Sequence, residues 1–90
     1  MRRESPPRIL VVEDDPPIAA GIVRGLTHAG FSVELATDGE RGAALGLAEE
    51  FALTVLDLML PGRGGFEVLG LWRERTSTPV IVLTARTDLD

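Results

Sequence analysis

Acidic side chains stand at the ends of two short apolar segments that lie far apart along this sequence. Asp57 closes the segment 53–57, and a Pro-Gly pair four residues later turns the chain. Glu13 and Asp14 directly follow the apolar segment 8–12. Taken alone, Asp57 would be interpreted as a residue that caps a turn. A second acidic group in an equivalent position raises the alternative that these carboxylates act together.

Clustered carboxylates favour the binding of a cation and, beside it, phosphoryl chemistry. Two like charges about 4 Å apart repel by about 1 kcal/mol in water and about 4 kcal/mol at an intermediate dielectric, so a cluster holds either a proton or a cation. Oxygen donors without cysteine favour Mg²⁺, and the single histidine, His28, lies in a predicted helix away from the acids. A carboxylate beside Mg²⁺ is a competent nucleophile toward phosphorus. Thr84, which follows the segment 80–83, could donate a hydrogen bond to a phosphate or simply cap its strand.

Alternating strands and helices are predicted to position these groups. Apolar, β-branched segments predict strands and amphipathic segments predict helices, which implies parallel strand pairing. The carboxyl ends of parallel strands share one edge of a sheet, and the first and third strands are neighbours in a flavodoxin-like order. The predicted fold class is therefore α/β, a flavodoxin-like three-layer sandwich. The predicted strands are 8–12, 31–35, 53–57 and 80–83, and the predicted helices are 16–29, 39–50 and a third that follows Gly65.

Two helical patterns lead to more specific expectations. Phe66, Leu69 and Trp72 recur at spacing three and predict one apolar face, with Trp72 as a core anchor. Gly42 and Gly46 lie four apart on one face of the second helix. They indicate either a close approach to the sheet or a drift toward small residues without a structural cause.

Composition restricts the class of protein. Ninety residues allow one domain, with residues 1–7 expected to form a flexible lead-in and 8–90 to fold. A formal net charge of −5, with nine basic residues that are all arginine, argues against nucleic-acid binding by these residues. No apolar run is long enough to span a bilayer and no secretory signal is evident. A cytoplasmic protein that does not contact membranes is the expectation.

Three separated motifs resemble the receiver domain of two-component response regulators. They are residues 9–15 (Ile-Leu-Val-Val-Glu-Asp-Asp), residues 55–62 (Val-Leu-Asp-Leu-Met-Leu-Pro-Gly) and residues 79–85 (Pro-Val-Ile-Val-Leu-Thr-Ala). The amino-acid sequences of the last two motifs are most similar to those of transcription factors of the OmpR/PhoB type. The resemblance extends over residues 8–90 and implies the fold of the CheY-like receivers.

The resemblance implies a role for each residue that matches these motifs. Asp57 would be the phosphoacceptor that receives a phosphoryl group from a sensor histidine kinase. Glu13, Asp14, Asp57 and the backbone carbonyl of Met59 would bind Mg²⁺. Thr84 would be the switch hydroxyl that responds to the phosphate. The expected function is thus a regulatory phosphoacceptor domain in a phosphorelay, not an enzyme, and a domain that belongs to a transcriptional regulator.

Departures from the family pattern keep other interpretations open. The fifth strand, the lysine that pairs with the phosphate and the switch aromatic residue have no counterpart, so the receiver is expected to be truncated after its fourth strand. The exposed edge of that strand predicts a homo-oligomer or a strand-exchanged dimer. The missing lysine favours, as an alternative, a pseudo-receiver that binds proteins without phosphorylation. A phosphohydrolase with an aspartyl nucleophile would need a carboxylate where Met59 stands.

Overall fold

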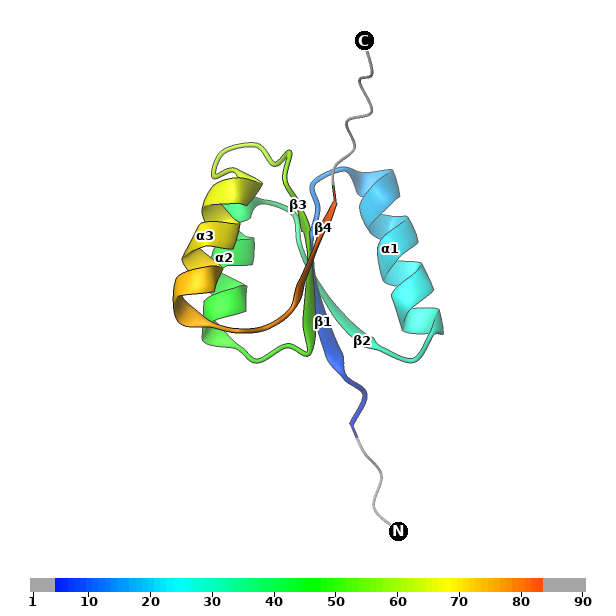
Figure 1. The fold of residues 1–90 in the computed structure, drawn as a ribbon. Coiled ribbons are helices and arrows are strands. Elements are labelled where there is room, and N and C mark those ends of the chain that lie inside the picture. The colour runs from blue at the N-terminus through cyan, green and yellow to red at the C-terminus, as the bar shows by residue number, and fades with distance from the viewer. Residues whose placement is uncertain (1–4, 84–90) are drawn as a thin grey trace.

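The chain folds into a parallel sheet between two helical layers. The structure, a computed structural model, describes residues 5–83. Helix α1 covers one face of the sheet, and α2 and α3 cover the other (Figure 1). The strands are β1 (Arg8–Val12), β2 (Ser32–Ala36), β3 (Leu53–Asp57) and β4 (Val80–Leu83), and the helices are α1 (Pro16–His28), α2 (Gly39–Ala48) and α3 (Gly65–Arg75).

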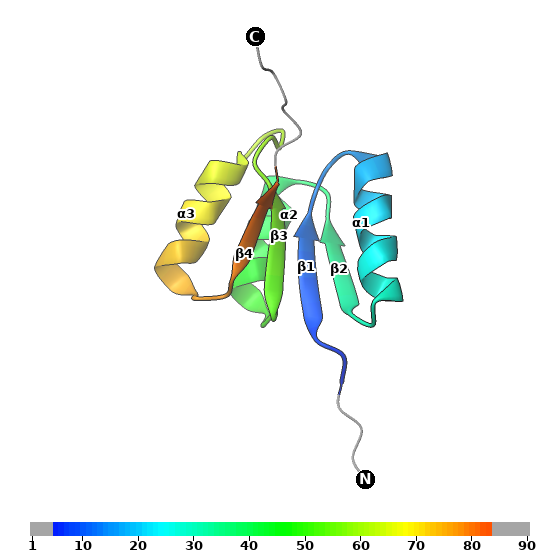
Figure 2. The same cartoon turned by 45° about the vertical axis from the view of Figure 1, so that its right-hand side comes forward.

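The order of the strands places the first and third side by side. All pairs are parallel, and the order is β2-β1-β3-β4 (Figure 2). The register pairs Val12 with Leu56 and Asp57 with Leu83, so the strands end at one edge. The flavodoxin-like α/β fold class predicted from the alternating segments is confirmed.

Helix start signals in the sequence correspond to actual caps. The Asp15 carboxylate accepts a hydrogen bond from the Ile18 N–H (3.2 Å), and two prolines fill the first turn of α1. Asp38 caps α2 in the same way by accepting from the Arg41 N–H (2.8 Å). These caps fix where each helix leaves the carboxyl edge of the sheet, which is the edge that carries the acids.

Trp72 anchors the core between α2, α3 and the sheet. Its side chain is only 1% exposed, and its indole N–H donates to the Ala43 carbonyl (3.4 Å). A Cβ at Gly46 would lie within 3 Å of the indole ring, and one at Gly42 would lie 2.7 Å from a methyl of Val12. Both glycines therefore allow close approach, Gly42 to the sheet and Gly46 to α3, and the alternative of a drift toward small residues is excluded.

The predicted apolar face of α3 was wrong at one position. Phe66 is 73% exposed, whereas Gly65, Val68 and Trp72 face the core. Residues three apart are 300° apart around a helix, so a stripe at constant spacing three rotates by about 60° per step. Phe66 is thereby carried about 120° away from Trp72 and out of the core.

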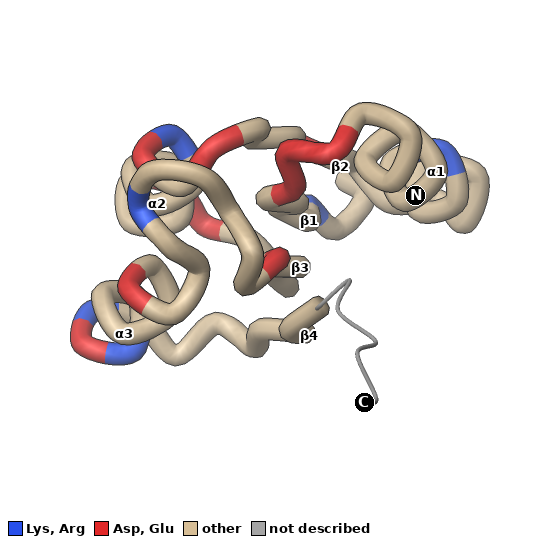
Figure 3. Tube along the Cα trace, turned by 90° about the horizontal axis from the view of Figure 1, so that it is seen from above, with Lys and Arg blue, Asp and Glu red and all other residues tan. Residues whose placement is uncertain are grey.

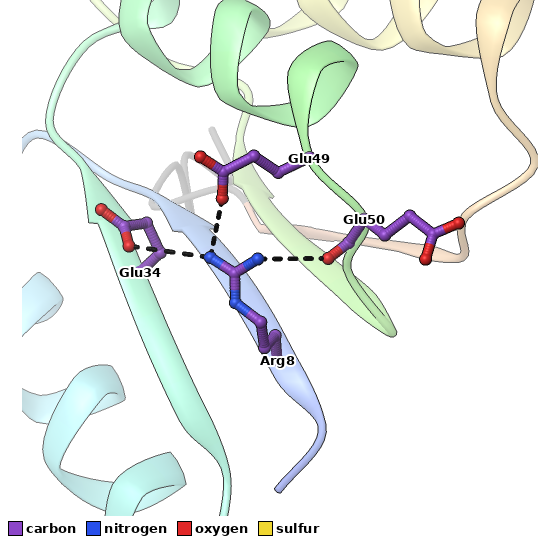
Figure 4. Close-up of polar contacts among 4 residues, drawn as sticks. All are labelled: Arg8, Glu34, Glu49 and Glu50. Atoms are coloured by element: carbon purple, nitrogen blue, oxygen red, sulfur yellow. Dashed lines mark hydrogen bonds and ion pairs between the residues drawn. The ribbon is translucent and has the colours of Figure 1, made fainter. Parts of the chain in front are cut away.

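Arg8 ties the amino-terminal end of β1 to the segment that joins α2 and β3 (Figure 4). Its Nη2 donates to Glu49 Oε1 at 2.8 Å and lies 3.9 Å from Glu34 Oε1, and its Nη1 donates to the Glu50 carbonyl at 3.5 Å. The guanidinium also lies over the Phe51 ring, 4.6 Å from the centroid. These contacts lie at the amino-terminal end of β1, on the side of the sheet opposite to the carboxyl edge that carries the acids.

We expect Arg8→Met to lower the free energy of unfolding by about 1 kcal/mol. A partly exposed ion pair contributes about 0.2–1 kcal/mol, and a cation over an aromatic ring at an exposed site about 0.5–1 kcal/mol. Urea denaturation at low salt and in about 1 M NaCl measures both, because only the ion pair is strongly screened. Arg41→Met, at an exposed position of α2, is the matched control. An equal loss in both variants would show that Arg8 has no special role.

Strand β4 is an edge strand among the described residues. Ile81 and Val82 are 50% and 41% exposed and point to opposite faces of the sheet.

No helix within residues 5–83 has the length and apolar character needed to cross a membrane.

Candidate functional site

Three carboxylates converge at the carboxyl edge of the sheet. One oxygen each from Glu13, Asp14 and Asp57 lies within 4.8 Å of the other two. Viewed onto this edge, the acidic segments at the ends of β1 and β3 lie beside each other (Figure 3). The cluster predicted from strands 40 residues apart is therefore present in the fold.

Backbone hydrogen bonds extend β1 by one residue and so fix Glu13. The Glu13 N–H donates to the Ala36 carbonyl (3.0 Å), which continues the pairing with β2. The Glu13 carboxylate in turn accepts from the Asp15 N–H at 3.1 Å. Glu13 is buried with 3% exposure, whereas Asp14 is more exposed. Glu13 is thus a buried member of the cluster and Asp14 its more exposed member.

Asp57 is held by the residues that follow it. The Met59 N–H donates to Asp57 Oδ1 (3.0 Å), and the Leu58 N–H donates to the Leu83 carbonyl at the end of β4 (3.1 Å). Asp57 itself is 4% exposed. The carboxylate is therefore pre-oriented by a local Asx-type turn.

Gly65, which the sequence marks only as the residue that leads into the third helix, sets the path of the chain beside Asp57. Its N–H donates to the Leu58 carbonyl (3.3 Å). A Cβ at this position would lie 2.5 Å from the Asp57 carbonyl oxygen and as close to Leu58 Cα. Only glycine allows α3 to begin against the end of β3, and the Gly-Gly pair in the sequence was the available signal.

Arg63 fastens the loop between β3 and α3 to the start of α2. Its Nε lies 3.5 Å from Glu40 Oε2 and 3.9 Å from Glu67 Oε2. The Arg63 carbonyl also occupies the space that a Cβ of Gly39 would need. The loop that carries Met59 therefore contacts both α2 and α3 through Arg63.

Burial raises the pKa of the Glu13 carboxyl. Desolvation is the largest cause, and the nearby charges of Asp57 and Asp14 act in the same direction, while the hydrogen bond from the Asp15 N–H opposes them. In the metal-free chain the ionised form of Glu13 is thus disfavoured. A cation at the cluster would relieve both the desolvation and the repulsion.

We expect the metal-free chain to lose stability as pH rises through the range that begins at the ordinary pKa of glutamate. The folded state holds the Glu13 proton to higher pH than the unfolded state does, so ionisation at higher pH costs folding free energy. Glu13→Gln should flatten this pH dependence and stabilise the metal-free protein at neutral pH by the order of 1 kcal/mol. Thermal unfolding in chelator across pH 4 to 8 measures it. An unchanged pH profile in the variant would contradict this assignment.

The structure places most of the predicted site residues together. Glu13, Asp14 and Asp57 form the cluster, and Met59 follows Asp57 with its apolar side chain 48% exposed. Thr84 lies outside the described residues.

The donor set of the cluster fits a hard divalent cation. It consists of carboxylate oxygens from Glu13, Asp14 and Asp57, and oxygen-only sites with few protein ligands suit Mg²⁺, which retains several waters. An open α/β sheet with such a site at the carboxyl ends of its strands defines a class of ligand-binding or phosphoryl-accepting domains. The site lies at the carboxyl ends of the neighbouring strands β1 and β3, which is where a parallel sheet with this strand order is expected to bind a ligand.

Comparison with known proteins identifies the family. Residues 9–90 match the response regulator receiver domain family, and the chain belongs to it. A receiver domain from Francisella superposes with a TM-score of 0.84 at 31% identity, covering 91% of this chain and 69% of that one. The Thermotoga maritima response regulator TrrA, solved in complex with Mg²⁺-BeF, gives 0.84 at 33% identity, covering 90% and 71%. Receiver domains are regulatory phosphoacceptors that bind Mg²⁺ at an acidic pocket and interact with histidine kinases.

The curated relatives place the chain with the OmpR/PhoB type. It is 40% identical to the transcriptional regulatory protein HprR of Escherichia coli over 92% of this chain and 37% of the relative. It is 46% identical to the transcriptional activator IrlR of Burkholderia pseudomallei over 91% and 36%, and 47% identical to the transcriptional regulatory protein TcrA of Mycobacterium tuberculosis over 93% and 34%. The chain spans about a third of the length of these relatives.

Proposed function

We propose that Asp57 accepts a phosphoryl group from a sensor histidine kinase. Glu13, Asp14, Asp57 and the backbone carbonyl of Met59 would bind Mg²⁺, which when bound neutralises charge on the incoming phosphoryl oxygens. The observation that carries this proposal is the convergence of three carboxylates within 4.8 Å at the carboxyl edge of the sheet. The relatives that this chain matches are transcriptional regulators, so the domain would regulate transcription. Its location would be the cytoplasm.

The reaction proceeds by nucleophilic attack of one Asp57 carboxylate oxygen on phosphorus. The new P–O bond forms as the bond between phosphorus and the donor breaks, and the leaving group keeps that electron pair. The hydrogen bond from the Met59 N–H to Asp57 Oδ1 (3.0 Å) holds the carboxylate in place, which reduces the ordering needed for attack. Thr84 would then donate its hydroxyl to the phosphate. No other chemistry is required of the chain, in keeping with a regulatory domain rather than an enzyme.

Incubation with acetyl phosphate and Mg²⁺, followed by intact mass spectrometry, tests the proposal. We expect one phosphoryl adduct, its loss in Asp57→Ala, and its persistence in Asp15→Asn, a change at the neighbouring helix cap. An unmodified chain under conditions that label a control receiver would contradict the proposal. That result would support a pseudo-receiver that binds partners without phosphorylation.

The edge of β4 is proposed as the site of self-association. Its side chains are uncharged, two of them are about half exposed, and its outer backbone groups face no other strand within residues 5–83. A second copy that pairs antiparallel about Ile81 would place the two Ile81 side chains opposite each other. Strand exchange between two copies would use the same edge. Residues 1–90 as a whole would bind neither nucleic acid nor a membrane surface.

Cross-linking through a single introduced cysteine tests this association. The sequence contains no cysteine, so Ile81→Cys gives one thiol per chain. Oxidation should produce disulfide-linked dimers faster than in Phe66→Cys, a control that is exposed to a greater extent (73%) on α3. Equal rates, together with a monomer by light scattering at all concentrations, would contradict a β4-mediated dimer.

A further inference from the structure

The end of the loop between β3 and α3, residues 58–64, packs its backbone against the first residue of α2. The carbonyl oxygen of Arg63 occupies the space that a Cβ of Gly39 would need, and the carbonyl carbon of Arg63 would lie 3.0 Å from that Cβ. Gly39 is buried at this contact. Because the neighbour is backbone, it cannot rotate away as a side chain would. A glycine at position 39 therefore determines how closely the loop approaches α2.

The start of the same loop holds a carboxylate of the acidic cluster. The Met59 N–H donates to Asp57 Oδ1 (3.0 Å), and Asp57 contributes one of the three oxygens that lie within 4.8 Å of one another. The position of the Met59 backbone thus affects how the Asp57 carboxylate is oriented toward Glu13 and Asp14.

The segment that joins these two contacts has little freedom to absorb a displacement. The Gly65 N–H donates to the Leu58 carbonyl (3.3 Å), which closes the loop at its base. Between Met59 and Arg63 the chain contains Leu60, which is buried (9% exposed), and a proline, whose ring fixes φ. A change in the position of the Arg63 backbone is therefore transmitted toward Met59.

We infer that Gly39 is a positioning residue for Mg²⁺ binding, although it lies outside the acidic cluster. By allowing the Arg63 backbone to contact α2, it holds the loop where the Met59 N–H orients Asp57. This inference rests on the proposed Mg²⁺ site and adds a residue that contacts neither the ion nor the phosphoryl group. Replacing a residue that orients a metal ligand typically weakens metal binding by about tenfold to a hundredfold.

Calorimetric titration of Gly39→Ala with MgCl₂ tests the inference, with Gly42→Ala as the matched control. Both glycines lie in α2, but a Cβ at Gly42 would lie 2.7 Å from a methyl group of Val12 and not against the loop. We expect Gly39→Ala to bind Mg²⁺ about tenfold more weakly and Gly42→Ala to bind it as tightly as the unaltered chain. In chelator, the Met59 amide should exchange its hydrogen faster in Gly39→Ala alone. Unchanged affinity in Gly39→Ala, or an equal loss in Gly42→Ala, would overturn the inference.

Gly62→Val keeps the inference testable if Gly39→Ala does not fold. Gly62 is exposed in the same loop, has a φ of 69°, and a Cβ there would meet nothing within 4 Å. A β-branched residue strongly disfavours this φ, so the substitution should alter the path of the loop without a collision with α2. We expect weaker Mg²⁺ binding in this variant as well. Unchanged affinity would show that the loop does not position the site.

Labelling by acetyl phosphate separates failure of this inference from failure of the proposed function. At limiting Mg²⁺, Gly39→Ala should be phosphorylated about tenfold more slowly than the unaltered chain, and saturating Mg²⁺ should restore the rate. Equal rates at both concentrations would overturn the positioning role and leave the phosphoacceptor role standing. If no variant were labelled but the Mg²⁺ affinities followed the expected order, the phosphoacceptor role would fall and the positioning role would stand.

Discussion

Trp72→Ala is expected to lower the free energy of unfolding by about 3–5 kcal/mol. Truncating a buried aromatic side chain to alanine removes its burial and leaves a cavity, with a cost in this range. Trp72 is 1% exposed and fills the space over Gly46 between α2 and α3, and its indole N–H bond to the Ala43 carbonyl is lost as well. Since small domains are stable by about 5–15 kcal/mol, the variant should be at most marginally folded. Urea denaturation followed by far-UV circular dichroism measures the change.

Phe66→Ala on the same helix is the matched control for Trp72. Its side chain is 73% exposed, so the change should alter the free energy of unfolding by no more than about 0.5 kcal/mol. Similar losses for both variants would contradict the core described here. A large loss at Phe66 alone would instead restore the apolar face that spacing three predicts.

Asp14→Asn is expected to weaken Mg²⁺ binding by about tenfold to a hundredfold. A unit charge about 4 Å from a divalent ion contributes about 2 kcal/mol even at the dielectric of water, and a factor of ten in affinity corresponds to about 1.4 kcal/mol. Asp14 is on the more exposed side of the cluster, so the isosteric change should leave the fold intact. Isothermal titration calorimetry with MgCl₂ measures the affinity.

The neighbouring Asp15→Asn provides the control for charge alone. Asp15 caps α1 by accepting from the Ile18 N–H, and asparagine is an equally good cap. It lies outside the group of converging carboxylates, so its loss should change Mg²⁺ affinity only slightly. If both variants lost affinity equally, binding would depend on general negative charge and not on the site.

The arrangement of the site was predictable from sequence because it depends on strand ends. Alternating apolar and amphipathic segments determine a parallel sheet, and the carboxyl edge of that sheet then collects whatever residues follow the strands. The strand pattern alone therefore predicted that Asp57 and Glu13 lie close together. The Asp15 cap was likewise visible as an acid before two prolines.

Other contacts depend on packing that sequence patterns do not describe. The exposure of Phe66 reflects a rotation around α3 that a count of apolar residues misses. Gly46 beneath Trp72 is a close approach between two helices 26 residues apart in sequence, and Gly65 packs against the Asp57 carbonyl because of how the loop between β3 and α3 folds back. The contacts of Arg8 with Glu49 and Phe51 join residues more than 40 positions apart, and neither partner signals the other.

Chemical trapping of the phosphoryl adduct tests the convergence of these acids on one site most directly. Borohydride reduces an aspartyl phosphate to homoserine, which peptide mass spectrometry then locates in the sequence. After treatment with acetyl phosphate and Mg²⁺, we predict homoserine at position 57 and nowhere else, and its loss when Mg²⁺ is replaced by chelator. Homoserine at position 14 or 15, or labelling of residue 57 that is indifferent to Mg²⁺, would contradict the account.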